Sequence, residues 1–378
     1  MNNTVENLNA VLTFIKNTFV GKDDIVDLLG VCLVARENAF LLGPPGTAKS
    51  AIVRLLSSCI EGGKNFEYLL TRFTEPSEIF GPFDIRKLKN GDLVTNTDGM
   101  LPEASMVFLD EIFNANSAIL NSLLTALNEK IFRRGKQLID LPVLTFVGAS
   151  NLLPEEETLE ALLDRFLIRV KCENVDPQNL EKVLLAGWQL DRRKTAAEKP
   201  MLSPDLVREM QREARAVDLG SVRGEYLNLI HAMRNAGVKV SDRRAVKFQY
   251  LIAASAYLSG RNHAVISDLW VLKHTWDTEE QIDILAGMVN TVIENDPEEK
   301  QHPQAKARQY PDAEQLLREL TDLADKWTNE NTSPEERNVI KDKLRYVQAR
   351  SKWIGNAEHK KALTDKANAL WKTMLETT

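Results

Sequence analysis

The chain has few cysteines, few histidines and no long apolar run. Its 378 residues include three cysteines and five histidines. The cysteines are odd in number and lack metal-ligand spacing, so we expect reduced packing residues, and the scattered histidines predict no metal site. No apolar run approaches the roughly 18 residues of a membrane span, and the N-terminus lacks a basic-then-apolar signal pattern. We therefore expect a cytoplasmic protein without a membrane span.

Positive charge is not in excess either. The chain has 48 Lys and Arg against 54 Asp and Glu, a formal net charge of −6. A mainly electrostatic grip on nucleic acid is therefore not favoured, and we expect nucleic acid not to be a partner. The length suits two or three domains.

Residues 39–50 have the pattern of a phosphate-binding loop. Ala39–Leu42 predicts a short buried strand, and an apolar-periodic helix pattern follows the loop. The loop residues are Gly43, Pro44, Pro45, Gly46, Thr47, Ala48, Lys49 and Ser50. The backbone N–H groups of such a loop turn inward and bind phosphate oxygens. We expect Lys49 to reach the β- and γ-phosphates of ATP and Ser50 to bind Mg²⁺. Ala48 stands where glycine is usual, and because alanine tolerates helical dihedral angles, we expect this position to be helical.

An acidic pair follows another buried run. Met106–Leu109 predicts a strand, and Asp110 and Glu111 come directly after it. Open parallel sheets bind ligands at the carboxyl ends of their strands. We therefore expect Asp110 to hold the Mg²⁺ shell and Glu111 to orient and deprotonate the attacking water. The pair alone is weak evidence, and the phosphate-binding loop upstream strengthens it.

Two further polar residues lie beside predicted strands. Asn151 ends the apolar stretch 144–150 and is expected to polarise the water or the γ-phosphate, with a turn asparagine as the alternative. Arg165 precedes a strand predicted at 167–170, near the edge where a neighbouring subunit would present its nucleotide. An arginine finger supplied in trans stabilises transition-state charge. The alternative for Arg165 is a salt bridge with Asp164.

The segment before the first strand often packs on the adenine in P-loop ATPases. Val20 and Ile25 are the candidates here, with core packing as the alternative.

Two arginines open a later helix. Arg243 and Arg244 fall in the first turn after Ser241, where the helix dipole disfavours cations. A phosphate partner would explain such an arginine. The ordinary alternative is an exposed arginine whose charge Asp242 relieves.

Two hairpins are predicted within the first half. Asn90-Gly91 is a strong hairpin signal inside 85–94, and a second turn falls near 134–136 inside 130–141. Both hairpins are candidates to touch a substrate or partner, or else to fill subunit interfaces.

Strand-like runs stop near residue 175, and helical patterns continue to the end. We expect an α/β protein with an αβα nucleotide-binding core and parallel sheet at 1–174, an all-α subdomain at 175–276 and a C-terminal helical domain at 277–378. The apolar stripes of the last helices predict the core of a small bundle.

Taken together, the motifs resemble the MoxR family of AAA+ ATPases. The resemblance covers about residues 10–295 and rests on GPPGTAKS, VFLDEIFNA, LTALNE, GASN and LDRF; TRFTEPSEIFGP and SDRR look like the RavA branch. It implies Walker A at 43–50, Walker B at 107–111, sensor 1 at Asn151, an arginine finger at Arg165 and sensor 2 at Arg243, with Arg244 as the other alignment. Alanine before the Walker A lysine is usual in this family.

The resemblance also implies a mode of action. Such proteins are thought to form hexameric rings with ATP and Mg²⁺ between subunits, a lid after the core, and chaperone-like activity, often with a von Willebrand factor A (vWA) protein. The RavA branch carries a β-rich C-terminal insertion, and no strand-rich segment follows residue 280 here. The hairpins resemble the helix-2 insert and the pre-sensor-1 hairpin.

Two other readings stay open. A nucleic-acid motor would use the basic tip formed by Arg133, Arg134 and Lys136, against the acidic balance of the chain. The other reading is a metal-chelatase-type motor subunit or a scaffold that does not hydrolyse ATP. The presence of all the expected catalytic residues argues against the scaffold.

Overall fold

A five-stranded parallel sheet forms the centre of the computed structural model, with the strand order β2-β3-β6-β1-β7. The structure describes residues 2–86, 94–134, 137–175, 179–192, 199–294, 296, 301–306, 313–328, 334–351, 354 and 357–376. The strands are β1 (Ala39–Leu42), β2 (Asn65–Leu69), β3 (Met106–Asp110), β6 (Thr145–Ser150) and β7 (Ile168–Lys171). β1 and β6 are buried throughout, because helices cover both faces of a parallel sheet. The predicted α/β class is confirmed.

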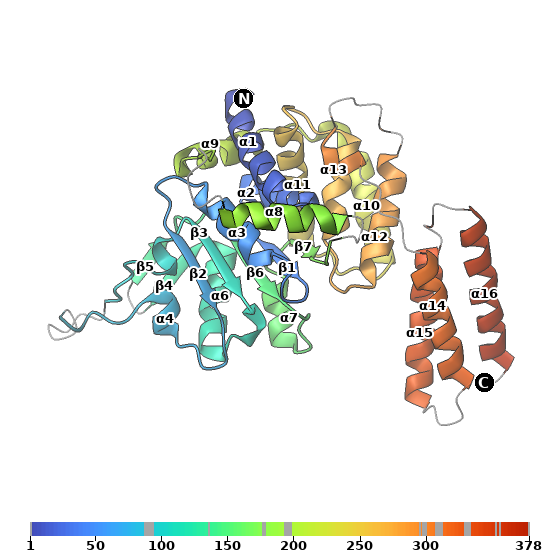
Figure 1. The fold of residues 1–378 in the computed structure, drawn as a ribbon. Helices are drawn as coiled ribbons and strands as arrows, with labels where there is room; N and C mark the ends of the chain where they lie inside the picture. Colours follow the sequence, from blue (N-terminus) through green and yellow to red (C-terminus); the bar gives the residue numbers. More distant parts are fainter. Residues whose placement is uncertain are drawn as a thin grey trace.

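Helices lie on both sides of this sheet (Figure 1). α1 (Asn2–Thr18), α2 (Asp23–Ala35) and α3 (Lys49–Ser58) occupy one side, and α6 (Ser117–Glu129) and α7 (Glu157–Leu163) the other. The connections contain α4 (Pro76–Phe80), η1 (Leu101–Glu103) and η2 (Ile112–Asn114). Helices α2, α3 and α6 present buried apolar residues to the sheet, as their sequence periodicity predicts.

The strand register places the carboxyl ends of the strands along one edge. Leu42 lies opposite both Ser150 and Lys171, and Leu69 lies opposite Asp110. The residues that follow these strands are therefore neighbours in space.

The second hairpin is present as β4 (Ile131–Arg134) paired antiparallel with β5 (Gln137–Asp140). At the first hairpin only the base is described, where Phe83 forms an antiparallel bridge with Thr95. Its Asn90-Gly91 turn lies outside the described residues, as do Gly135, Lys136 and the side chain of Arg134.

The second half of the chain is helical, as predicted. Its elements are α8 (Leu180–Arg192), α9 (Pro204–Ala214), η4 (Gly220–Val222), α10 (Arg223–Asn235), α11 (Asp242–Leu258), η5 (Ile266–His274), α12 (Gln281–Ile293) and α13 (Pro303–Lys306). η5 is a 3₁₀ helix, and α13 is a single short turn of helix. Buried apolar side chains from the sheet helices through α12 and α13 form one continuous core.

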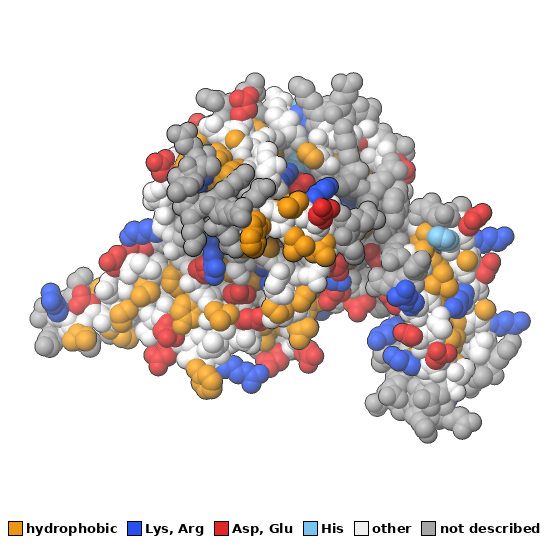
Figure 2. Space-filling view, viewed as in Figure 1, with side chains coloured by type: hydrophobic (Ala, Val, Ile, Leu, Met, Phe, Trp, Pro, Cys, Tyr) orange, Lys and Arg blue, Asp and Glu red, His pale blue; other side chains and the backbone are white. Residues whose placement is uncertain are grey.

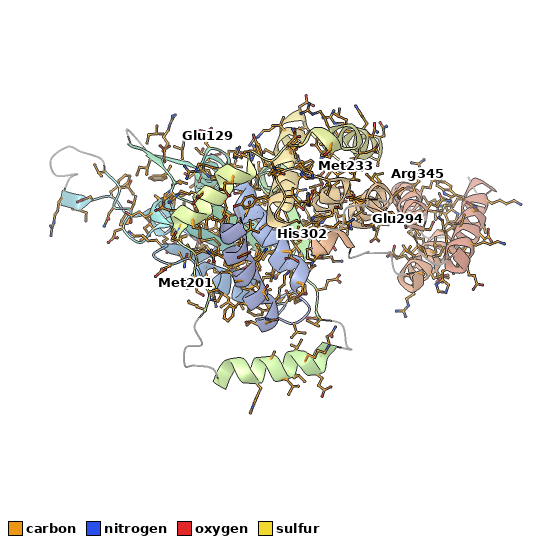
Figure 3. All side chains as sticks on the ribbon, turned by 90° about the horizontal axis from the view of Figure 1, so that it is seen from above. Glu129, Met201, Met233, Glu294, His302 and Arg345 are labelled. Carbon is orange, nitrogen blue, oxygen red and sulfur yellow. The ribbon has the colours of Figure 1, made fainter. Side chains whose placement is uncertain are left out.

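Helix α8 stands away from the rest of the molecule (Figure 3). Its exposed large apolar side chains are Leu180, Leu184, Leu185 and Trp188, and Figure 2 shows apolar side chains on the face of the molecule that α8 crosses. The chain before α8 leaves β7 at the carboxyl edge. The chain after it returns at residue 202, which bridges to Ile60 at the opposite edge.

A separate core holds the C-terminal bundle. Helices α14 (Ala313–Thr328), α15 (Pro334–Ser351) and α16 (Ala357–Glu376) bury a cluster that includes Leu316, Leu344 and Leu363. Among the residues that the structure describes, no helix is both long and apolar enough to cross a membrane.

The partly buried carboxylate of Asp277 joins the sheet to the helical half. Asp277 Oδ1 accepts hydrogen bonds from Arg169 of β7 at 2.5 Å and from Arg244 of α11 at 2.8 Å. The side chains of Arg169 and Arg244 are only 1% and 4% exposed. Burial alone would raise the pKa of Asp277, but the two guanidinium groups outweigh it and hold this pKa below its usual value. The ion pairs of Asp277 with Arg169 and Arg244 therefore fix α11 against the sheet.

The segment 301–306 docks on η5. The His302 ring stacks on Trp270 at a centroid distance of 4.7 Å, and Gln304 Nε2 donates to Asp27 of α2 at 2.8 Å (Figure 3 labels His302). His302 is 4% exposed, and this burial lowers its pKa to about 4. The docked segment therefore contains a histidine that resists protonation.

We predict that acid weakens the folded state through His302. The unfolded chain takes up a proton at an ordinary histidine pKa near 6.5 while the folded chain does not until about pH 4, so stability falls as the pH drops between these values. His302→Phe keeps the aromatic stack and removes the proton. Urea unfolding at pH 7.5 and pH 4.5 should show the wild type losing about 2–3 kcal/mol more than the variant. Equal losses in both proteins would show that His302 does not carry the effect.

Candidate functional site

The loop between β1 and α3 lies at the carboxyl edge of the sheet. At Gly43 an added Cβ would lie 2.1 Å from the Cys172 carbonyl oxygen, so only glycine allows this close approach of the two chain segments. Thr47 is buried, and its Oγ1 donates to Pro44 O at 2.9 Å, which closes the loop on itself. At Gly46 an added Cβ would meet nothing within 4 Å, so the loop is open on that side.

Ala48 is not helical, contrary to the expectation from sequence. Its φ of 68° and ψ of 13° place it in the left-handed region, and α3 begins one residue later. A side chain in this region costs about 1 kcal/mol or more, which explains why glycine is the common residue here. The left-handed turn lets the backbone leave the loop and enter α3 directly at Lys49.

Lys49 is buried and connects the loop to Asn151. Its Nζ donates to the carbonyl oxygens of Gly43 and Pro44, and to Asn151 Oδ1 at 3.3 Å. Asn151 Nδ2 in turn donates to Glu111 Oε1 at 2.5 Å. Three of the residues singled out from the sequence, Lys49, Asn151 and Glu111, therefore form one line of polar contacts.

Ser50 and Asp110 form a second contact beside this line. Ser50 Oγ donates to Asp110 Oδ2 at 3.3 Å, and the other carboxylate oxygen accepts from the Glu111 backbone N–H at 3.0 Å. Glu111 itself has a φ of 49°, in the left-handed region. Strained backbone of this kind tends to occur at functional sites.

These residues fit MgATP. The open loop, the helix N-terminus and the Lys49 ammonium suit phosphate oxygens. A hydroxyl and a carboxylate 3.3 Å apart are the oxygen donors that Mg²⁺ takes from a protein beside nucleotide phosphates.

The two residues proposed to pack on the adenine, Val20 and Ile25, differ in their exposure to solvent. Val20 is half-buried, and the next residue, Gly21, approaches Val175 after β7, at the same edge as the loop. Ile25 is only 1% exposed and packs in the core. Val20 therefore remains a candidate, whereas the core-packing alternative holds for Ile25.

Arg165 lies at the opposite edge of the sheet. Ala39 of β1 lies opposite Ile168 of β7, and Asn38, just before β1, donates to Arg165 O at 2.8 Å. The length of β1, about 13 Å, therefore separates Arg165 from the loop of its own chain. Its Nη1 forms the ion pair with Asp164 at 2.6 Å that the sequence suggested as the alternative.

Arg243 and Arg244 have different surroundings. Arg244 is buried in the joint with Asp277, as described above, and is not available to a ligand. Arg243 is exposed and donates to Asn128 Oδ1. The residue before Asn128 accepts a hydrogen bond from Asn38, so Arg243 also lies at the edge that carries Arg165.

Sequence reasoning missed Asn116 and the turn that it holds. Asn116 caps α6, and its Nδ2 donates to Thr74 O at 2.7 Å and Arg72 O at 3.5 Å. Thr71 and Thr74 close this turn with hydrogen bonds to each other, and Phe73 at its tip is 92% exposed. An asparagine before a helix pattern predicts the N-cap, but nothing local predicts the turn that it binds.

We predict that position 48 tolerates glycine but not a β-branched residue. Ala48→Gly should change stability by less than about 1 kcal/mol, since relief of strain offsets the extra freedom of the unfolded chain. Ala48→Val should destabilise by about 2 kcal/mol or more. Ala51→Val, at an exposed helical position of α3, is the matched control and should cost under about 1 kcal/mol. Urea unfolding measures all three, and equal costs for the two valines would contradict the left-handed backbone at Ala48.

Comparison with known proteins identifies the family. A model described as the MoxR domain in the MoxR-vWA-beta-propeller ternary systems matches residues 6–212, more than half of the chain, and an AAA lid domain model matches 221–289. The uncharacterised proteins MJ0812 and MJ0079 of Methanocaldococcus jannaschii are 36% identical over 274 residues and 35% identical over 292 residues. The first alignment covers 72% of each chain, and the second covers 76% of this chain and 75% of the relative.

Two more distant proteins agree. Chaperone MoxR1 of Mycobacterium tuberculosis is 25% identical over 184 residues, 48% of each chain. The crystal structure of a proposed ATPase from Cytophaga hutchinsonii superposes with a TM-score of 0.62 at 18% identity, over 78% of this chain and 96% of the other, and so shows a shared fold. Because the MoxR model matches more than half of the chain and the AAA lid model matches the segment that follows, the chain belongs to the MoxR family of AAA+ ATPases.

Proposed function

We propose that this protein is a Mg²⁺-dependent ATP hydrolase that uses the energy of hydrolysis to remodel or assemble a protein partner. The observation that carries the proposal is the contact line from Lys49 through Asn151 to Glu111, with the Ser50–Asp110 contact beside it. A phosphate cradle, a pair of metal-binding oxygens and a carboxylate base are the parts that phosphoryl transfer to water requires.

Each residue of the line has a separate role in this proposal. Lys49 releases its loop carbonyls and binds the β- and γ-phosphate oxygens, while Ser50 and Asp110 hold the Mg²⁺ shell. Bound MgATP supplies the electrophilic phosphorus and neutralises charge on the phosphates. Glu111 orients the attacking water and accepts its proton, and Asn151 fixes the Glu111 carboxylate through its 2.5 Å hydrogen bond.

The proposed site is completed by a second copy of the chain. Arg165 and Arg243 lie at the edge opposite the loop, so neither reaches the nucleotide of its own chain without a large rearrangement. Presented to a neighbour, both would add positive charge at its γ-phosphate, as finger and sensor 2. Head-to-tail contacts of this kind close into rings, and we propose the hexamer that the family resemblance implies.

The partner is proposed from the family. The matching family model describes MoxR domains in systems with vWA and β-propeller proteins, and a vWA protein is our candidate partner in the cytoplasm. Phe73 offers a contact surface near the site: Asn116 holds its turn, and Leu70 N–H donates to Asp110 O at 2.9 Å. The RavA-like branch stays a proposal based on the motifs. No observation on the described residues favours the nucleic-acid motor or the chelatase subunit.

We predict that Glu111→Gln binds ATP with nearly unchanged affinity and hydrolyses it at least 100-fold more slowly, because the amide cannot accept the proton. With ATP and Mg²⁺, the variant should shift from a smaller species to a hexamer by mass measurement. Glu61→Gln, at an exposed position after α3, is the control and should keep wild-type turnover. Undiminished turnover by Glu111→Gln would remove Glu111 from the role of base.

We also predict complementation between two inactive variants. Arg165→Ala should bind ATP without turnover, and Lys49→Ala should fail to bind it. In a mixed ring an intact loop of the first variant meets an intact arginine of the second, so mixing should restore part of the activity. Arg223→Ala, at an exposed position on α10, should retain full activity alone. If mixed rings form and stay inactive, Arg165 does not act in trans.

A further inference from the structure

A cavity of about 520 Å³ lies between the end of α2, the start of β6 and one face of α9. It is at the amino edge of the sheet. Leu144 in its wall precedes β6, whereas Asn151 of the proposed ATP site follows β6, so about 20 Å separates the two sites. The cavity is therefore distinct from the nucleotide site of the same chain.

The charged side chains around this cavity are strongly unbalanced. Four arginines line it against a single acidic residue, Asp205, although the whole chain has a net charge of −6. The arginines are Arg36, Arg208, Arg212 and Arg215, and we call this site the arginine cavity. Arg208, Arg212 and Arg215 share one face of α9 and its C-cap, at spacings of four and three residues.

The arrangement brings like charges close together. Like charges three or four residues apart on a helix destabilise it, and a bound anion would relieve this repulsion. Arg36 has a φ of 59°, in the left-handed region, at a helix C-terminal position where glycine is usual. Among the residues that the structure describes, Arg208 is the one cavity arginine with an acidic partner, Asp205, at 2.8 Å. The guanidinium groups of Arg36 and Arg212 form no hydrogen bond or ion pair with the other residues that the structure describes.

The walls of the cavity are held in place. Gln211 is buried between the arginines of α9, and its Nε2 donates to Leu33 O of α2 at 2.8 Å and Leu144 O at 3.4 Å. The guanidinium of Arg215 stacks on the Tyr250 ring at 4.1 Å. Stacking uses the face of the guanidinium and leaves its N–H donors, which lie in its plane, able to bind an anion.

We propose that the arginine cavity binds a small anion with two or more phosphate groups, as a second site apart from the ATP site. Arginine forks match phosphate oxygens bidentately. The volume suits a small molecule, within the usual 300–1,000 Å³ of ligand sites. The bound anion holds α9 against α2 and β6, the elements that lead into the phosphate-binding loop and Asn151. The proposal does not depend on ATP hydrolysis.

The test measures the binding of tripolyphosphate to the full-length Lys49→Ala variant. This substitution removes phosphate binding by the loop, and every further substitution is made in this variant. Calorimetry should show one tripolyphosphate per chain, with an affinity that falls steeply with added salt. Arg36→Ala with Arg212→Ala should weaken binding at least 10-fold. Arg212→Lys, which keeps the charge and loses the fork, should weaken it less. Arg223→Ala is the matched control, an exposed arginine outside the cavity, and should bind as the Lys49→Ala variant does.

Further arms separate the outcomes. If ATP binds more tightly than tripolyphosphate, the ligand of the cavity is a nucleotide. If tripolyphosphate binds more tightly than ATP, the ligand is a free oligophosphate. Both outcomes support the proposal. The proposal fails if tripolyphosphate does not bind at millimolar concentration, if citrate binds equally well, or if Arg223→Ala weakens binding as much as the cavity variants. It also fails if the cavity variants change only the mass of the assembly, because the arginines then contact another copy.

Discussion

The partly buried carboxylate of Asp277 is the charge on which the joint between the sheet and the helical half depends. It is shared by Arg169 of β7 and Arg244 of α11. Removing Asp277 would leave the buried guanidinium groups of Arg169 and Arg244 uncompensated, and the loss of one partner of a buried ion pair typically costs about 3–5 kcal/mol. Because Arg244 is committed to this joint, the adjacent Arg243 points elsewhere and remains exposed. One ion cluster thus fixes the position of α11 and decides which of the two arginines can meet a ligand.

The parallel sheet divides the polar residues between its two edges. Parallel strands place every carboxyl end on the same side, so the loop, Asp110, Glu111 and Asn151 converge there without further specification. Arg165 precedes its strand and is necessarily at the other side. Within one chain the two sets cannot meet around one phosphate. This separation of Arg165 from the loop follows from the topology of the sheet. It is the physical basis for proposing that two copies of the chain together form each ATP site.

The elements that the sequence predicted well are those encoded over a few neighbouring residues. Apolar runs followed by Gly43, Asp110 or Asn151 specify both a strand and the polar group at its end. The left-handed backbone of Ala48 could not be read from its identity, because alanine is compatible with the helix expected there, and the approach of Cys172 to the loop sets the path of the chain. The choice between Arg243 and Arg244 depends on Asp277, which lies over thirty residues away. Local pattern cannot encode such distant partners.

The proposed ATP site and the arginine cavity share the strands that connect them. β1 begins three residues after Arg36 and ends just before Gly43. β6 begins just after Leu144 and ends just before Asn151. Both strands are fully buried. Close-packed protein interiors of this kind have low compressibility and transmit strain. An anion that tightens the amino ends of β1 and β6 therefore limits the movements available to the loop and to Asn151. Because coupling free energies are reciprocal, nucleotide at the carboxyl edge would change anion affinity by the same factor.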